Sequence, residues 1–153
     1  MVAGVVVLLA LVSGCGGDEV DVRPTGVTGT DRTACLALVK ALPRHVSDQP
    51  ARAVTGETAV AAAWGDPAVV LRCGVGRPKG YTRFAACQTA NGVDWFVPDE
   101  AIQDQGTDVV MTTIGRSPSV EVVVPAQDRP PVAAMVDLAP VIKAHTRVTH
   151  RCS

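Results

Sequence analysis

The sequence predicts an α+β fold: an antiparallel sheet of about five strands, covered on one face by an N-terminal and a C-terminal helix and braced by disulfides. Three observations lead to this prediction. Apolar residues recur with helical spacing near both ends of the chain and alternate with polar residues in its middle. Turn signals rich in Gly, Pro and Asn separate the alternating segments. Cysteines are distributed over the whole region that these elements occupy.

The first helix is expected to begin near residue 31. Asp31 or Thr33 can accept hydrogen bonds from the free N–H groups of a first helical turn. Its apolar residues follow at positions i, i+3, i+4 and i+7, namely Cys35, Leu38, Val39 and Leu42. Pro43 then ends the helix.

A second, short helix is expected at Thr58–Trp64, which is rich in alanine. Gly65 and Pro67 supply the usual stop signals. Trp64 is expected to anchor a core that otherwise consists mainly of Ala and Val.

The central part of the chain contains segments that alternate as strands do. They are Ala68–Val75, Phe84–Ala90, Val93–Val97, Asp108–Ile114 and Val120–Val124. Asn91-Gly92 is the strongest short hairpin signal available and predicts a type I′ turn. Such a turn places Ala90 opposite Val93, and Gln88 opposite Trp95.

The last helix is expected to start at Pro130-Pro131. Its apolar stripe consists of Val132, Met135, Val136, Ala139 and Ile142. Because Pro140 lies inside that stripe, we expect a kink there or two short helices in sequence.

The chain has five cysteines, an odd number. If Cys15 carries a lipid, the other four can form two disulfides. Three connectivities are open, and we favour Cys73–Cys87 between successive strands and Cys35–Cys152 between the ends of the terminal helices. Since no pair has C-x2-C spacing, we predict no metal site and no cofactor.

The N-terminus resembles a bacterial lipobox. An apolar run of about eleven residues, Val2–Val12, is too short to cross a bilayer as a helix and ends in Ser13-Gly14-Cys15. We interpret 1–14 as a signal peptide, 15–30 as the lipidated cysteine with a flexible spacer, and 31–153 as one globular domain. An ordinary secreted protein and an uncleaved anchor are the alternatives. No basic residue precedes the run, so either the true start codon lies upstream, which we favour, or the terminal amine supplies the only positive charge.

Charge and motifs exclude several function classes. Fourteen basic and fifteen acidic residues leave no field for nucleic-acid binding. Nucleophile-elbow, P-loop and zinc-protease motifs are absent from the sequence, and the histidines near the C-terminus, His145 and His150, are expected to be solvated. Four basic residues surround a Gly-rich loop and are candidates to bind an anionic glycan, phosphate or lipid headgroup: Arg72, Arg77, Lys79 and Arg83. A solvated hairpin end is the other interpretation.

Five features together resemble a small actinobacterial family of exported proteins, domain of unknown function 3515. They are Trp64–Val75, Cys87, Asn91–Trp95, Thr113–Arg116 and the C-terminal cysteine, Cys152. The resemblance covers about residues 33–152. It implies export or membrane association, and it implies no catalytic residues because the family has none assigned.

The sequence is compatible with two functions. The preferred one is a non-catalytic lipoprotein on the extracytoplasmic face of the cell membrane, held by acyl chains on Cys15, that binds an envelope protein or glycan. The alternative is an exported enzyme or accessory factor acting on anionic cell-wall material through the Arg72–Arg83 region. A deep pocket joining Asp66, Arg72 and Arg116 favours the alternative, and a flat sheet face favours the first.

Overall fold

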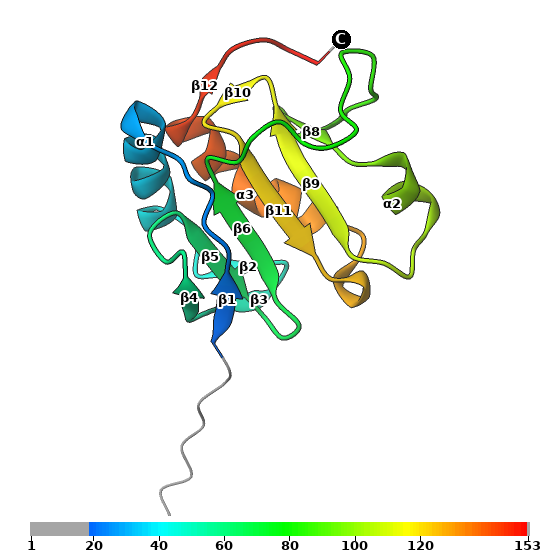
Figure 1. The fold of residues 1–153 in the computed structure, drawn as a ribbon. Coiled ribbons are helices and arrows are strands. Elements are labelled where there is room, and N and C mark those ends of the chain that lie inside the picture. The colour runs from blue at the N-terminus through cyan, green and yellow to red at the C-terminus, as the bar shows by residue number, and fades with distance from the viewer. Residues whose placement is uncertain (1–18, 153) are drawn as a thin grey trace, which may run out of the picture.

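A computed structural model describes residues 19–152 (Figure 1). The expected signal peptide and the lipidated Cys15 lie outside the described residues. Among the helices of residues 19–152, none has the length and apolar character needed to cross a membrane.

The fold has two layers, an eight-stranded antiparallel sheet and a helical layer on one of its faces (Figure 1). The strands, in spatial order, are β2 (His45–Val46), β3 (Gln49–Arg52), β5 (Ala61–Trp64), β6 (Val69–Cys73), β11 (Val120–Val124), β9 (Val109–Ile114), β8 (Val93–Phe96) and β7 (Gln88–Ala90). The helices are α1 (Gly29–Lys40), α2 (Asp99–Gln103) and α3 (Val132–His145), with a 3-10 turn at Ala126–Asp128. The α+β class is therefore confirmed, with a larger sheet than the sequence predicts.

Two small sheets flank the large one. β1 (Val20–Val22) pairs in parallel with β4 (Val54–Gly56), and β10 (Arg116–Ser117) pairs with β12 (Arg147–Val148) in antiparallel. Val22 is buried, so the chain is already packed on the domain at β1. The described part of the predicted flexible spacer over 15–30 therefore contains a packed strand, β1, and from Gly29 on it belongs to α1.

Alternation determines which side of the sheet forms the core. Val69, Leu71 and Cys73 of β6 are fully buried beneath the helices, as are alternate valines of β11. The hairpin β7–β8 forms as predicted, with positive φ at Asn91 and Gly92. Its register is also confirmed, because Gln88 faces Trp95 and Ala90 faces Val93.

The predicted helix at Thr58–Trp64 is wrong, because this segment contains strand β5. β5 lies between β3 and β6, and backbone pairing on both sides outweighs the helix propensity of alanine. Trp64 is buried as expected, and its indole N–H donates to the Pro43 carbonyl at 3.0 Å.

Both terminal helices form, with altered details. α1 begins at Gly29, so Asp31 is no cap and instead accepts hydrogen bonds from the Ser117 hydroxyl. α3 is one helix through Pro140, which is exposed together with Val136, so the Val136 carbonyl left unpaired by proline can be hydrated. The expected stripe is rotated. The buried residues of α3 are Ala134, Met135, Leu138, Ala139, Val141 and Ile142.

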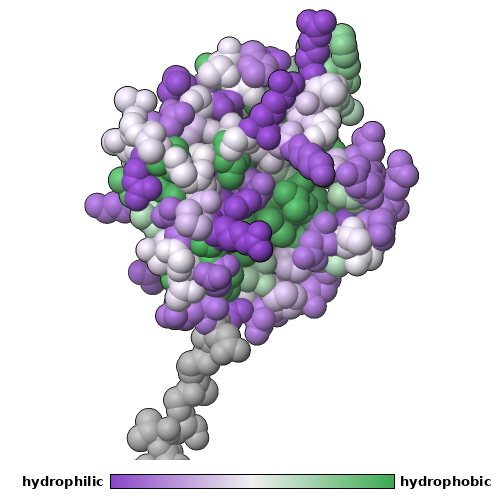
Figure 2. All heavy atoms as spheres, in the orientation of Figure 1, coloured by the Kyte–Doolittle hydropathy of each residue, from purple (hydrophilic) through white to green (hydrophobic). Residues whose placement is uncertain are grey.

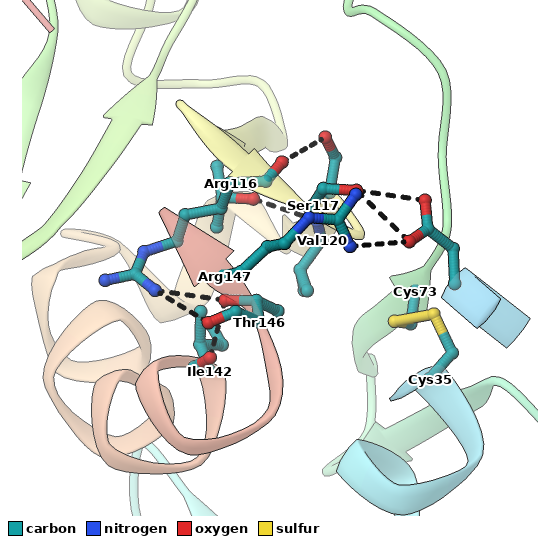
Figure 3. Close-up of a disulfide and its surroundings, with 11 residues drawn as sticks. Cys35, Cys73, Arg116, Ser117, Val120, Ile142, Thr146 and Arg147 are labelled. Atoms are coloured by element: carbon teal, nitrogen blue, oxygen red, sulfur yellow. Dashed lines mark hydrogen bonds and ion pairs between the residues drawn. A yellow bond between two sulfur atoms is a disulfide. The ribbon is translucent and has the colours of Figure 1, made fainter. Parts of the chain in front are cut away.

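Both predicted disulfide pairings are wrong. Cys35 is bonded to Cys73, with the Cα atoms 5.5 Å apart, and Cys87 is bonded to Cys152 at 6.3 Å. The reason is the strand order: β6 and β7 follow one another in sequence, but three other strands, β11, β9 and β8, lie between them in the sheet. Cys73 faces the helical layer, where Cys35 of α1 meets it, and the bond lies between these two elements (Figure 3).

Candidate functional site: a basic hollow on the outer sheet

The sheet face opposite the helices, called here the outer face, carries residues in rows across the strands. Val70, Val123 and Val110 stand side by side, and Val110 is 41% exposed. The next row contains Arg72 and Glu121 in facing positions. Figure 2 shows the corresponding mixture, with hydrophilic side chains lying beside a hydrophobic patch.

Arg72 is paired within this face. Its Nε donates to Glu121 Oε1 at 3.0 Å, and its Nη2 donates to the same oxygen. A guanidinium engaged in this way is compensated by its own carboxylate. Arg72 does line a shallow hollow of about 260 Å³ together with Arg77 and Lys79, but Glu121 lines the same hollow and compensates the charge of Arg72.

Loop 74–87 leaves β6 and crosses the outer face before it reaches β7 (Figure 1). Tyr81 of this loop packs edge-on against Phe96 of β8, with ring centroids 5.4 Å apart. The Arg77 guanidinium lies 5.1 Å from the Tyr81 ring centroid, within cation–π range. The sheet thus positions Tyr81, and Tyr81 positions Arg77.

Between this loop and the ends of β9 and β10 lies a hollow of about 350 Å³, called here the basic hollow. Its lining residues are Arg77, Pro78, Tyr81, Arg83, Thr113, Ile114, Gly115, Arg116, Ser119 and His150. Three of them are arginines and one is a histidine, whereas none is acidic. The lining chemistry therefore suits an anion and offers no carboxylate to a cation.

Arg77 and Arg83 are the accessible charges of the basic hollow. Both side chains are exposed, and neither forms an ion pair within residues 19–152. Arg83 lies 4.9 Å from the ring centroid of Phe84, which is itself 83% exposed. Two of the four predicted anion-binding residues are therefore brought together with free guanidinium groups.

Arg116 has a different role, because its side chain is buried. Its Nη1 donates to the Thr146 hydroxyl at 3.0 Å (Figure 3). Its Nη2 donates to the Gly92 carbonyl at 3.3 Å. Burial lowers the pKa of Arg116, the positive charge of Arg151 lowers it further, and Asp94 opposes both. Arg116 thus joins β10 to the end of α3 and to the β7–β8 turn.

The C-terminal segment, residues 147–152, forms another wall. Thr149 N–H donates to the Gly115 carbonyl at 2.7 Å. Gly115 has φ +67°, and a Cβ there would collide with the His150 carbonyl. Glycine at 115 therefore allows the close approach that places His150 on the hollow.

The second disulfide joins the two walls. Cys87 ends the loop that carries Arg77 and Arg83, and Cys152 ends the segment that carries His150. The Cys152 N–H also donates to the buried Asp94 carboxylate at 3.2 Å. The Cys87–Cys152 bond and Asp94 together fix the C-terminal segment beside the sheet.

The remaining predicted residues lie elsewhere. Lys79 lies outside the basic hollow and borders other hollows, among them one with Asp99 and Glu100 of α2 and one with Arg72 and Arg77. Asp66 is exposed and pairs with Arg52 at 3.2 Å. Asp66, Arg72 and Arg116 have separate partners, and the hollow that Arg116 lines includes neither of the other two.

Within the described part of the chain, no group of three or more His, Cys, Asp or Glu side chains is placed to hold a metal ion. Sequence reasoning missed His150 and Asp94 as contributors to the hollow and its support. Only the spacing Gly115-Arg116 carried a signal, since a glycine that ends a strand can mark a close backbone approach.

Comparisons with curated proteins and with solved structures gave no match. The model of the family described as "Protein of unknown function (DUF3515)" matches residues 1–150, nearly the whole length of the sequence. The chain belongs to the DUF3515 family.

Proposed function

We propose that this chain is an exported protein, anchored by lipid on Cys15 to the extracytoplasmic face of the cell membrane, whose domain is a non-catalytic binding or accessory module. Its partner is another component of the envelope, a protein or a glycan.

The pairing of the cysteines carries this proposal. Cys35, Cys73, Cys87 and Cys152 are all used in disulfides, which form and persist outside the reducing cytosol. Cys15 is the cysteine left over, and it follows an apolar run and two small residues. A lipid on Cys15 accounts for the odd count and for the run that precedes it.

The basic hollow supports binding more than catalysis. Its Ser119 hydroxyl donates to the Arg116 carbonyl at 3.3 Å, so it is not paired with a base. His150 is hydrogen-bonded through Nδ1 to Thr149 at 3.1 Å, and both residues are exposed. A nucleophile activated by a base that a third group orients is the arrangement expected of a hydrolase. The described residues of the hollow do not supply it.

The alternative function is an enzyme or accessory factor acting on anionic cell-wall material, and it would use the same hollow as its binding site. Arg77 and Arg83 with no carboxylate beside them would hold a phosphate or carboxylate group of such material. Turnover of an anionic polymer by the purified protein would favour this alternative, and binding without turnover favours the module.

Intact mass of the protein extracted from membranes tests the proposal. We expect the mature chain to begin at Cys15 and to carry the added mass of acyl chains. The Cys15→Ser variant should lose that mass and leave the membrane fraction while keeping both disulfides. An unmodified Cys15 in membrane-extracted wild-type protein would refute the anchor.

A further inference from the structure

We propose that the basic hollow is a binding site for the phosphate or carboxylate groups of an anionic polymer, and that it faces away from the membrane that anchors the protein. The orientation rests on the proposed lipidation of Cys15, whereas the site itself does not.

The anion site follows from the lining of the hollow. Arg77 and Arg83 project from one loop, are exposed, and lack ion-pair partners among residues 19–152. Arg77 forms a cation–π contact with Tyr81, and Tyr81 packs edge-on against Phe96 of the sheet. His150, on the C-terminal segment, also lines the hollow. Guanidinium groups that are exposed but held in place are suited to two-pronged contacts with oxyanions.

Two braces hold the walls of this site. The Cys87–Cys152 bond links the arginine-bearing loop to the segment that carries His150. Arg116 holds β10, behind the hollow, against Thr146 at the end of α3. A site whose charged groups are held before binding loses less side-chain entropy when the ligand arrives.

The orientation follows from where β1 lies. β1 lies at the end of the sheet where β6 begins (Figure 1), and its Val20 N–H donates to the Ala53 carbonyl at 3.1 Å. The basic hollow lies beyond the other end of β6, where loop 74–87 starts, so the attachment point and the site occupy opposite ends of the domain (Figure 1).

The length of chain between Cys15 and β1 limits how far the domain can turn. Five residue steps separate Cys15 from Val20, and an extended chain spans at most about 18 Å over them. A domain of this size measures roughly 35 Å across. The tether is therefore too short to let the domain invert and bring the hollow against its own bilayer. The geometry favours an anionic polymer of the surrounding envelope over the headgroups of the anchoring membrane.

Titration with two probe polymers tests the site. The Cys15→Ser full chain is titrated with long-chain inorganic polyphosphate and with polygalacturonate, which separates phosphate from carboxylate preference. We expect binding to at least one of them, and a loss of about tenfold or more in affinity for Arg77→Gln/Arg83→Gln. The matched control, Arg23→Gln/Arg44→Gln, removes the same charge from exposed positions outside the hollow and should change affinity less than about twofold.

Two outcomes would overturn the site. One is the absence of binding to either polymer, and the other is an equal loss of affinity in the two double variants. Because all four arginines are exposed, both variants should keep the native disulfides, and peptide mapping checks this.

Fluorescence quenching tests the orientation. Lipidated protein in phosphatidylcholine vesicles is labelled at Thr82→Cys, beside the hollow, or at Ala53→Cys, beside β1, once mapping shows native disulfides. A quencher attached to lipid headgroups should quench the Ala53 label strongly and the Thr82 label weakly. Equal quenching, or stronger quenching at Thr82, would overturn the orientation. If the protein does not insert into vesicles, the lipid anchor itself fails, and the polymer titration still decides the site.

Discussion

The two disulfides hold two different parts of the molecule. Cys35–Cys73 lies inside the core, where both residues are fully buried between α1 and β6. Cys87–Cys152 joins a long loop to the C-terminal segment, and both of its residues are partly exposed. The first bond braces the fold itself. The second braces the walls of the basic hollow. A disulfide that joins two core elements stabilises the fold, whereas one that joins a loop to a terminal segment holds the walls of the hollow.

The largest effect is expected for Cys35→Ser/Cys73→Ser. The bond closes a loop of 38 residues, which contributes about 4 kcal/mol in the chain-entropy model, and two hydroxyls would enter an apolar interior. Denaturant unfolding under oxidising conditions should show a loss of at least that size, or no folded protein. A loss below about 1 kcal/mol would show that the core does not depend on this bond.

Arg116→Met should cost about 2 kcal/mol, because it removes the hydrogen bonds to Thr146 and Gly92 from a buried position. The matched control is Arg147→Met, whose exposed ion pair with Asp31 spans 3.4 Å and should be worth less than about 0.5 kcal/mol. Thermal unfolding compares the two variants. Equal losses would mean that Arg116 does not join β10 to α3 as described.

Cys87→Ser/Cys152→Ser should destabilise the protein less than the loss of the core disulfide does. Its loop of 65 residues is the longer one, so loop length alone assigns it about 4 kcal/mol, no less than the core bond. We expect a loss of about 2 kcal/mol or less, because the C-terminal segment can detach locally without opening the core. Hydrogen exchange should be faster in 147–152 and unchanged in β6. A loss equal to that of Cys35→Ser/Cys73→Ser would mean that both disulfides stabilise the core to the same extent.

The smallest effect on stability is expected for Arg77→Gln/Arg83→Gln. Both side chains are exposed and form only cation–π contacts and no ion pair in the described structure, so the free energy of unfolding should change by less than about 1 kcal/mol. Chemical denaturation measures it. A substantial loss would mean that these arginines belong to the scaffold and not to a ligand site.

Local signals predicted part of this fold well. The Asn91-Gly92 turn fixed the register of β7 and β8 because its geometry depends on two residues only. Alternation found β6 and β11, since one face of each packs on helices. Strand β5 was missed because Ala61–Trp64 has no alternating pattern and becomes a strand only through its neighbours.

The site could be predicted only in part, for a related reason. Arg77 and Arg83 are close in sequence, so their charge was visible there. His150 reaches the same hollow through the packing of Gly115 and a disulfide spanning 65 residues, and neither leaves a local trace. The pairing of Arg72 with Glu121 left no local signal, because Glu121 is 49 residues away on a strand that pairs out of sequence order.

The affinity of Cys87→Ser/Cys152→Ser for the polymer that binds wild-type protein tests most directly whether the second disulfide holds the site. Near-ultraviolet circular dichroism of the buried Trp64 and Trp95 verifies in the same sample that the core is intact. We predict a core signal like that of the wild type and an affinity lower by about fivefold or more, since the walls of the hollow are no longer held before binding. An unchanged affinity with an intact core would show that the Cys87–Cys152 bond does not hold the binding site.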